Sequence, residues 1–152
     1  MLDIGLPPFY IRGVTYEQKG RWVYLVVTLG VYGAYLAVIL GRARTAGLSD
    51  VDYVAPLLWS LGIAIAASIV ARIVVEIVRP SGLQKADVRD RDIDRSGEYL
   101  AGLVLAVAMV VPFGLTMAQA GHFWIANAMY AAYVLSTVAG TVTKLIAYRR
   151  GL

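Results

Sequence analysis

Four long uncharged segments constrain this chain more than any other feature of its sequence. They cover residues 22–40, 53–71, 99–118 and 123–143, although the whole chain has 14 basic and 10 acidic residues. About 20 helical residues cross the hydrocarbon core of a bilayer, and a helix bonds its own backbone groups there. The sequence therefore predicts an all-α integral membrane protein, a four-helix bundle whose charges are confined to connectors and tails.

The composition fits one membrane domain over residues 1–152. The chain is 59% hydrophobic and only 16% charged, which is far more apolar than a soluble domain of this size. Residues 1–21 lack the apolar run of a cleavable signal peptide, so we expect them to form a cytoplasmic tail. Residues 79–98 are expected to form a cytoplasmic connector. The absence of Cys excludes disulfides and thiolate metal sites.

The distribution of Lys and Arg predicts the orientation of the chain. Twelve of the 14 fall in the tail, in the region from Arg72 to the third span, or at the C-terminal end, whereas only Arg42 and Arg44 fall elsewhere. The positive-inside rule then places both termini and the connector in the cytoplasm. The net charge of +4 is explained by orientation and by attraction to anionic lipid. We therefore expect membrane lipids as partners, and no direct binding of nucleic acid.

The two halves of the chain resemble each other. Residues 18–22 lead into the first span much as residues 95–99 lead into the third. Each half would then be a helical hairpin, and the two would be parallel repeats related about the membrane normal. Any two helical hairpins with basic ends would look similar, so duplication and generic likeness are both open.

Small residues predict where the helices touch. Lipid already solvates apolar side chains, so membrane helices associate through close packing of small residues. The expected packing positions are Ala64 and Ser68 in the second span, and Ala128, Ala132, Ser136 and Gly140 in the fourth. A substrate groove lined by the same small residues is the alternative.

Polar and proline residues inside the spans add further expectations. Asn127, Thr137 and Thr141 are available for hydrogen bonds between helices. Pro112 lies near the middle of the third span and predicts a kink there, because it lacks a backbone N–H.

The connector alternates Asp and Arg over residues 87–95. Asp90, Asp92 and Asp94 match the first ligand positions of a calcium loop, but Arg95 stands where the turn needs Gly. We therefore expect no metal and no other cofactor. Acidic residues early in the segment favour a helical lead into the third span. The candidate partner-binding residues are Asp87, Arg89, Asp90, Arg91, Asp94, Arg95, Tyr148, Arg149 and Arg150.

The connector also carries a resemblance to a known family. Its Arg-Asp and Ile-Asp-Arg-x-Gly pattern over residues 87–97, together with residues 124–127 and 144–151, resembles a family of small, uncharacterised bacterial four-span membrane proteins. The resemblance covers most of residues 20–152. It implies a bacterial inner-membrane location and an accessory regulatory role, because some members are encoded beside short helix-turn-helix regulators. It supplies no catalytic residue.

Three classes of function follow from these patterns. An enzyme is not expected, because the spans hold no carboxylate and the one imidazole, His122, lies in the short turn before the fourth span. A transporter, a channel or an anionic-lipid-binding protein would use an inward-facing pocket bounded by Arg72, Glu76 and Lys144. A salt bridge between Arg72 and Glu76 is the structural alternative for that pair. We favour a nonenzymatic regulatory or scaffolding component that binds a cytoplasmic regulator or a second membrane subunit, and self-association is also open.

Overall fold

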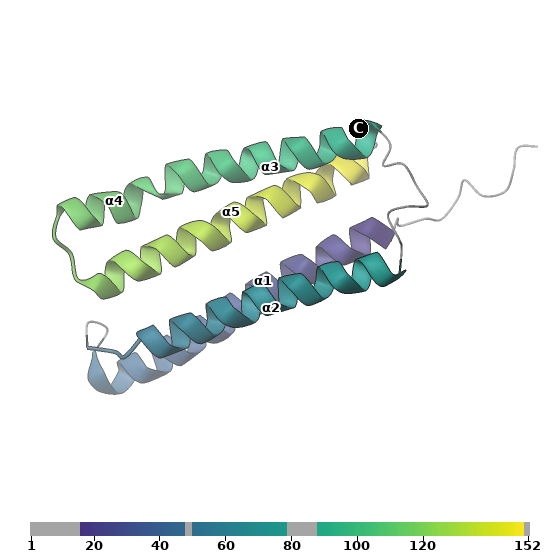
Figure 1. Cartoon of the computed structure of the whole chain (residues 1–152). Coiled ribbons are helices and arrows are strands. Elements are labelled where there is room, and N and C mark those ends of the chain that lie inside the picture. The colour runs from purple at the N-terminus through teal and green to yellow at the C-terminus, as the bar shows by residue number, and fades with distance from the viewer. Residues whose placement is uncertain (1–15, 48–49, 79–87, 151–152) are drawn as a thin grey trace, which may run out of the picture.

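The computed structural model describes residues 16–47, 50–78 and 88–150, and every regular element in these ranges is helical (Figure 1). The helices are α1 (Tyr16–Ala46), α2 (Val54–Val78), α3 (Val88–Ala108), α4 (Val110–Met117) and α5 (His122–Arg150). Among the described residues, the stretches long and apolar enough to cross a membrane are Gly20–Thr45, Val54–Ala71, Arg91–Met117 and His122–Arg149. The predicted fold class, an all-α four-helix membrane bundle, is confirmed.

The helices form two antiparallel hairpins. The first pairs α1 with α2, and the second pairs α3 and α4 with α5 (Figure 1). The starts of α1 and α3 and the ends of α2 and α5 lie together at one end of the molecule, which we call the basic end. The opposite end, which we call the turn end, holds the links from α1 to α2 and from α4 to α5. This arrangement brings together the segments that the sequence predicts to share one side of the membrane.

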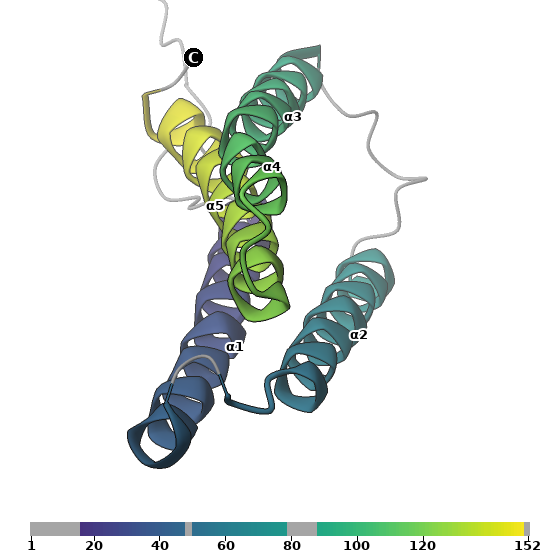
Figure 2. The same cartoon turned by 90° about the vertical axis from the view of Figure 1, so that its left-hand side faces the viewer.

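Helix α5 is the centre of the bundle. It packs extensively on α3, and also on α4 and α1, whereas α2 packs on α1 (Figure 2). The order of packing is therefore α2, α1, α5 and then α3 with α4. Large apolar side chains on the outer helices α2, α3 and α4 are exposed, among them Trp59, Ile77, Val107 and Phe113. A bilayer would solvate these side chains, so their exposure in the isolated chain fits four spans.

The third span is interrupted between α3 and α4, one turn before Pro112. Pro112 has no N–H to bond the carbonyl of Ala108, which is the last residue of α3. The flanking bonds persist, with Met109 N 2.9 Å from Leu105 O and Phe113 N 3.1 Å from Met109 O. The disturbance predicted from Pro112 thus takes the form of a short break in an otherwise continuous span.

Candidate functional site

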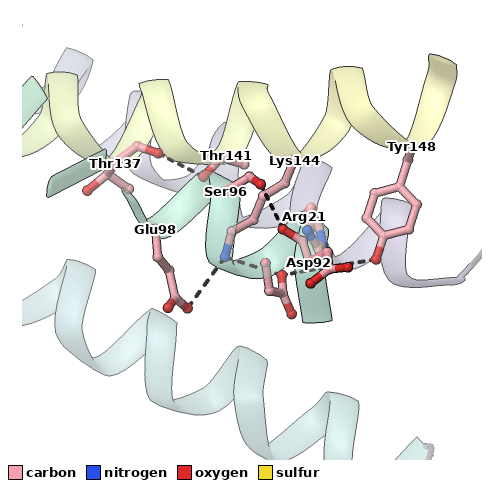
Figure 3. Close-up of polar contacts among 9 residues, drawn as sticks. Arg21, Asp92, Ser96, Glu98, Thr137, Thr141, Lys144 and Tyr148 are labelled. Atoms are coloured by element: carbon pink, nitrogen blue, oxygen red, sulfur yellow. Dashed lines mark hydrogen bonds and ion pairs between the residues drawn. The ribbon is translucent and has the colours of Figure 1, made fainter. Parts of the chain in front are cut away.

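A cluster of polar side chains, four of them charged, joins three helices at the basic end. Its members are Arg21 of α1, Asp94 and Glu98 of α3, and Lys144 and Tyr148 of α5, and we call it the Asp94 cluster. Figure 3 labels Arg21, Glu98, Lys144 and Tyr148. Arg21 Nη2 donates to Asp94 Oδ1 over 2.9 Å and to the Tyr148 hydroxyl over 3.2 Å. Lys144 Nζ lies 3.3 Å from the same Asp94 oxygen and 3.7 Å from Glu98 Oε1. One carboxylate oxygen therefore receives two cations from two different helices.

Helical spacing explains why these residues meet. Asp94 and Glu98 are four residues apart on α3, and Lys144 and Tyr148 are four apart on α5, so each pair lies along one helix face. Gly97 makes room between the two faces, because a Cβ at that position would overlap the aliphatic chain of Lys144. The cluster thus needs both the charge pattern and a glycine at that point of α3.

The cations of the cluster are better buried than the carboxylates. The side chains of Arg21 and Lys144 are 19% and 20% exposed, against 47% for Asp94 and 77% for Glu98. The Lys144–Glu98 pair is therefore a weak surface ion pair. The bond from Arg21 to Asp94 is short and charge-assisted, which makes it the stronger link.

The guanidinium of Arg21 is incompletely satisfied. Its carbon lies 4.7 Å from the centroid of the Tyr148 ring, a cation–π contact. Its Nη1 is buried and has no hydrogen-bond partner within the described part of the chain. An unpaired buried donor costs about 1–3 kcal/mol. The cluster therefore links helices while leaving one donor of Arg21 in need of an acceptor.

The structure separates the predicted partner-binding residues into two groups. Asp94 and Tyr148 belong to the Asp94 cluster and are half-buried between helices. Arg91, Arg95 and Arg149 are exposed at the basic end. Asp87 lies outside the described residues, as do the side chains of Arg89, Asp90 and Arg150. The exposed arginines are thus the described positions at which a partner would find free charge.

The predicted inward-facing pocket is not assembled by the described contacts. Lys144 reaches Asp94 and Glu98 on α3, whereas α2, which carries Arg72 and Glu76, packs on α1. The side chains of Arg72 and Glu76 lie outside those that the structure describes. A pocket at these three residues stays a prediction.

Two of the predicted small residues of the fourth span, Ser136 and Gly140, lie at the seam between α3 and α5. A Cβ at Gly140 would stand 2.8 Å from Ala101 Cβ and 2.9 Å from the Gly97 carbonyl oxygen. Ser136 is buried, and its hydroxyl donates to the Ala101 carbonyl across the seam over 2.8 Å. Ala132 is buried one turn further on, and Ala128 is half-buried.

The small residues of the second span have a different environment. Ala64 and Ser68 are half-buried, and the Ser68 hydroxyl donates to the Ala64 carbonyl of its own helix over 2.7 Å. Thr137 and Thr141 likewise bond carbonyls of their own helix α5, so the expectation that they bond another helix is wrong for their described hydrogen bonds. A Ser or Thr hydroxyl in a helix can bond the backbone carbonyl one turn earlier in the same helix, so it needs no acceptor from another helix.

An aromatic cluster that the sequence reasoning missed joins α1 to α5 nearer the turn end. The Tyr130 ring meets Tyr32 and Tyr35 edge to face, with centroids 5.2 Å apart in both pairs. The Tyr35 hydroxyl donates to Asn127 Oδ1 over 2.7 Å, so Asn127 does make the expected contact between helices. We call Tyr32, Tyr35 and Tyr130 the tyrosine cluster. The spacing of Tyr32 and Tyr35, three residues apart inside an uncharged span, was its one signal in the sequence.

A shallow hollow lies at the turn end itself. It has a volume of about 380 Å³ and is lined by Tyr53, Gly121, His122, Phe123 and Trp124. The Phe123 ring contacts Tyr53 and Trp124 edge to face, with centroids 5.3 and 5.2 Å apart. Aromatic rings of this kind favour the boundary between lipid and water.

The fold and its spans define the class of this chain, which is that of multi-pass α-helical membrane proteins. Comparisons with models of protein families, with curated proteins and with solved structures found no match. The resemblance carried by residues 87–97 therefore stays a prediction.

Proposed function

We propose that this chain is a nonenzymatic component of the bacterial inner membrane that presents a charged cytoplasmic surface to a protein partner. The observation that carries the proposal is that the basic end has both exposed arginines and an ion pair that joins the helices bearing them. Arg91, Arg95 and Arg149 are exposed there, while Asp94 and Lys144 tie together the helices that bear them. Charged side chains on helices that are held together suit recognition of a protein partner, because their positions are set before binding.

The mixture of charges favours a protein partner over lipid alone. Anionic lipid attracts clusters of Lys and Arg, and acidic neighbours weaken that attraction. On α3 the exposed Arg91 and Arg95 stand beside Asp92 and Glu98, which are also exposed. Interspersed charges of both signs give orientation and specificity in contacts between proteins. A soluble regulator or a second membrane subunit fits this surface.

The arrangement of the helices supports a cytoplasmic location for the basic end. This end gathers the starts of α1 and α3 and the end of α5 (Figure 1). Twelve of the 14 basic residues lie before the first uncharged segment, between the second and the third, or after the fourth, and Arg42 and Arg44 lie between the first and the second. Under the positive-inside rule such an end faces the cytoplasm.

Site-specific photocrosslinking in intact membranes tests the proposal. A photoreactive residue placed at Arg91, Arg95 or Arg149 is expected to give the same discrete protein adduct. A matched probe at Arg44, an exposed charged position near the turn end, is expected to give none. Reversing two charges, with Arg91→Glu and Arg95→Glu together, should reduce the adduct at Arg149 at least about tenfold, because opposed like charges cost several kcal/mol. Adducts only to lipid or to the chain itself would overturn the proposal.

A further inference from the structure

The two hairpins meet at a seam whose two ends have different chemistry. Helices α1 and α5 form most of the seam, because α1 is the helix of the first hairpin that packs most on the second hairpin, and it packs there on α5. Toward the turn end the seam is closed by the tyrosine cluster and by the hydrogen bond from Tyr35 to Asn127. At the basic end the described polar contacts across it belong to the Asp94 cluster. The described polar contacts across the seam are therefore between charged groups at the basic end and between neutral groups toward the turn end.

Arg21 is the member of the Asp94 cluster that comes from the first hairpin. It donates to Asp94 and to Tyr148, both of which belong to the second hairpin. The contacts of Lys144 with Asp94 and Glu98, by contrast, lie within the second hairpin. Loss of Arg21 would thus remove the described polar links between the hairpins at this end and leave the ion pairs of the second hairpin in place.

The closed arrangement is polar and imperfect. Arg21 Nη1 is buried without an acceptor in the described residues, and Asp94 Oδ1 is shared between Arg21 and Lys144. Water would satisfy that donor if the hairpins moved apart. The tyrosine cluster gains nothing comparable from opening, because Tyr35 is 3% exposed and its hydroxyl is already bonded.

We propose that the Arg21–Asp94 bond is a clasp that holds the two hairpins together at the basic end, with the tyrosine cluster as the pivot about which that end opens. Opening moves α1 and α2 relative to the exposed charges at the start of α3. The clasp involves only residues of this chain, so its test is independent of the test for the protein partner proposed above.

Distances between pairs of spin labels in lipid nanodiscs test the clasp. The chain has no Cys, so labels attach only at introduced cysteines. One pair, at Val23 on α1 and Tyr99 on α3, reports on the basic end. A second pair, at Val38 on α1 and Phe113 on α4, reports on the turn end. All four side chains are exposed and lie outside the two clusters.

Neutral substitutions of the clasp should open the basic end alone. In Arg21→Gln and in Asp94→Asn, the distance between labels 23 and 99 is expected to grow or broaden by on the order of 2 Å or more, the size of helix shifts at packed interfaces. The distance between labels 38 and 113 is expected to stay unchanged. The matched control Arg95→Gln removes an exposed arginine outside the cluster and should alter neither distance.

Each other outcome overturns the clasp. Unchanged distances in both neutral variants would show that the hairpins do not depend on the Arg21–Asp94 bond. Equal changes in both label pairs would show that the tyrosine cluster is not a pivot. Failure of both variants to fold would mean that the bond is required for the bundle itself, and so is not a clasp on a stable pivot.

Discussion

The substitution Gly140→Ala tests how closely α5 packs on α3. The added Cβ would stand 2.8 Å from Ala101 Cβ and 2.9 Å from the carbonyl oxygen of Gly97. Both atoms are rigid parts of α3, so no side-chain rotation relieves the contact. The two helices must separate, and the bond from the Ser136 hydroxyl to the Ala101 carbonyl, one turn away, must lengthen with them.

The expected loss of stability follows from three opposing effects. Overpacking a close contact costs about 1–3 kcal/mol. The weakened Ser136 bond adds up to about 0.6 kcal/mol, the average for hydrogen bonds between membrane helices. Alanine returns about 1 kcal/mol, because it favours a helix more than glycine does. We therefore expect Gly140→Ala to lower the free energy of unfolding by about 1 kcal/mol, within a range of roughly 0–2.6 kcal/mol.

The matched control is Gly102→Ala in α3. A Cβ at Gly102 meets no heavy atom within 4 Å, so this variant has the helix gain without the overlap and should be neutral or more stable. Both variants are compared by unfolding in mixed micelles with an increasing fraction of SDS, followed by circular dichroism. Equal stability of Gly140→Ala and Gly102→Ala would refute the described seam between α3 and α5.

Two further substitutions probe the two clusters in the same assay. Gly97→Ala should displace Lys144 from its ion pairs but destabilise less than Gly140→Ala, because a Lys side chain can rotate away. In a Lys144→Ala background the loss of stability should largely vanish, and a loss that persists there would contradict the overlap. Tyr35→Phe should lower the free energy of unfolding by about 0.6–1.5 kcal/mol, because the Asn127 side-chain oxygen loses its donor. The control Tyr133→Phe, at an exposed ring, should change it by only a few tenths of a kcal/mol, and equal effects would contradict the buried hydrogen bond.

The number and nature of the spans were readable from the sequence, and their limits were not. Hydrocarbon excludes charge, so the uncharged segments 22–40 and 123–143 mark two of the spans. The helices that contain them run over Tyr16–Ala46 and His122–Arg150. A helix does not stop where lipid ends, because charged residues continue it into water with little loss. Absence of charge therefore locates the span within a longer helix.

Local chemistry made other features predictable. A missing N–H acts on the carbonyl four residues earlier, so Pro112 marked the break at the end of α3 without any knowledge of the bundle. Four-residue spacing put Ser136 and Gly140 on one face of α5. The helix that this face would meet was not readable, because small residues fit many neighbours equally well.

The Asp94 cluster shows where reasoning from one chain stops. Arg21 and Asp94 are 73 residues apart, and no local periodicity relates them. From the sequence alone, Asp94 and Tyr148 were assigned to an outward surface, because nothing showed which helix they would meet. Their pairing with Arg21 follows only once α1 packs on α5. Long-range pairing, and not residue type, thus decides which charged side chains stay exposed.

The two clusters along the α1–α5 seam suit the two solvents that a membrane span meets. Within the spans, the Tyr35 hydroxyl and Asn127 satisfy each other, as polar groups must where water is absent. Near the basic end, the carboxylate of Asp94 is 47% exposed, so water can take over from Arg21 when the bond breaks. A hydrogen bond inside the lipid is kept, because no other donor or acceptor can replace the lost partner there. An ion pair that reaches water can break reversibly, because water can take the place of the lost partner. This difference is the physical reason to expect movement of the hairpins at the basic end and not at the tyrosine cluster.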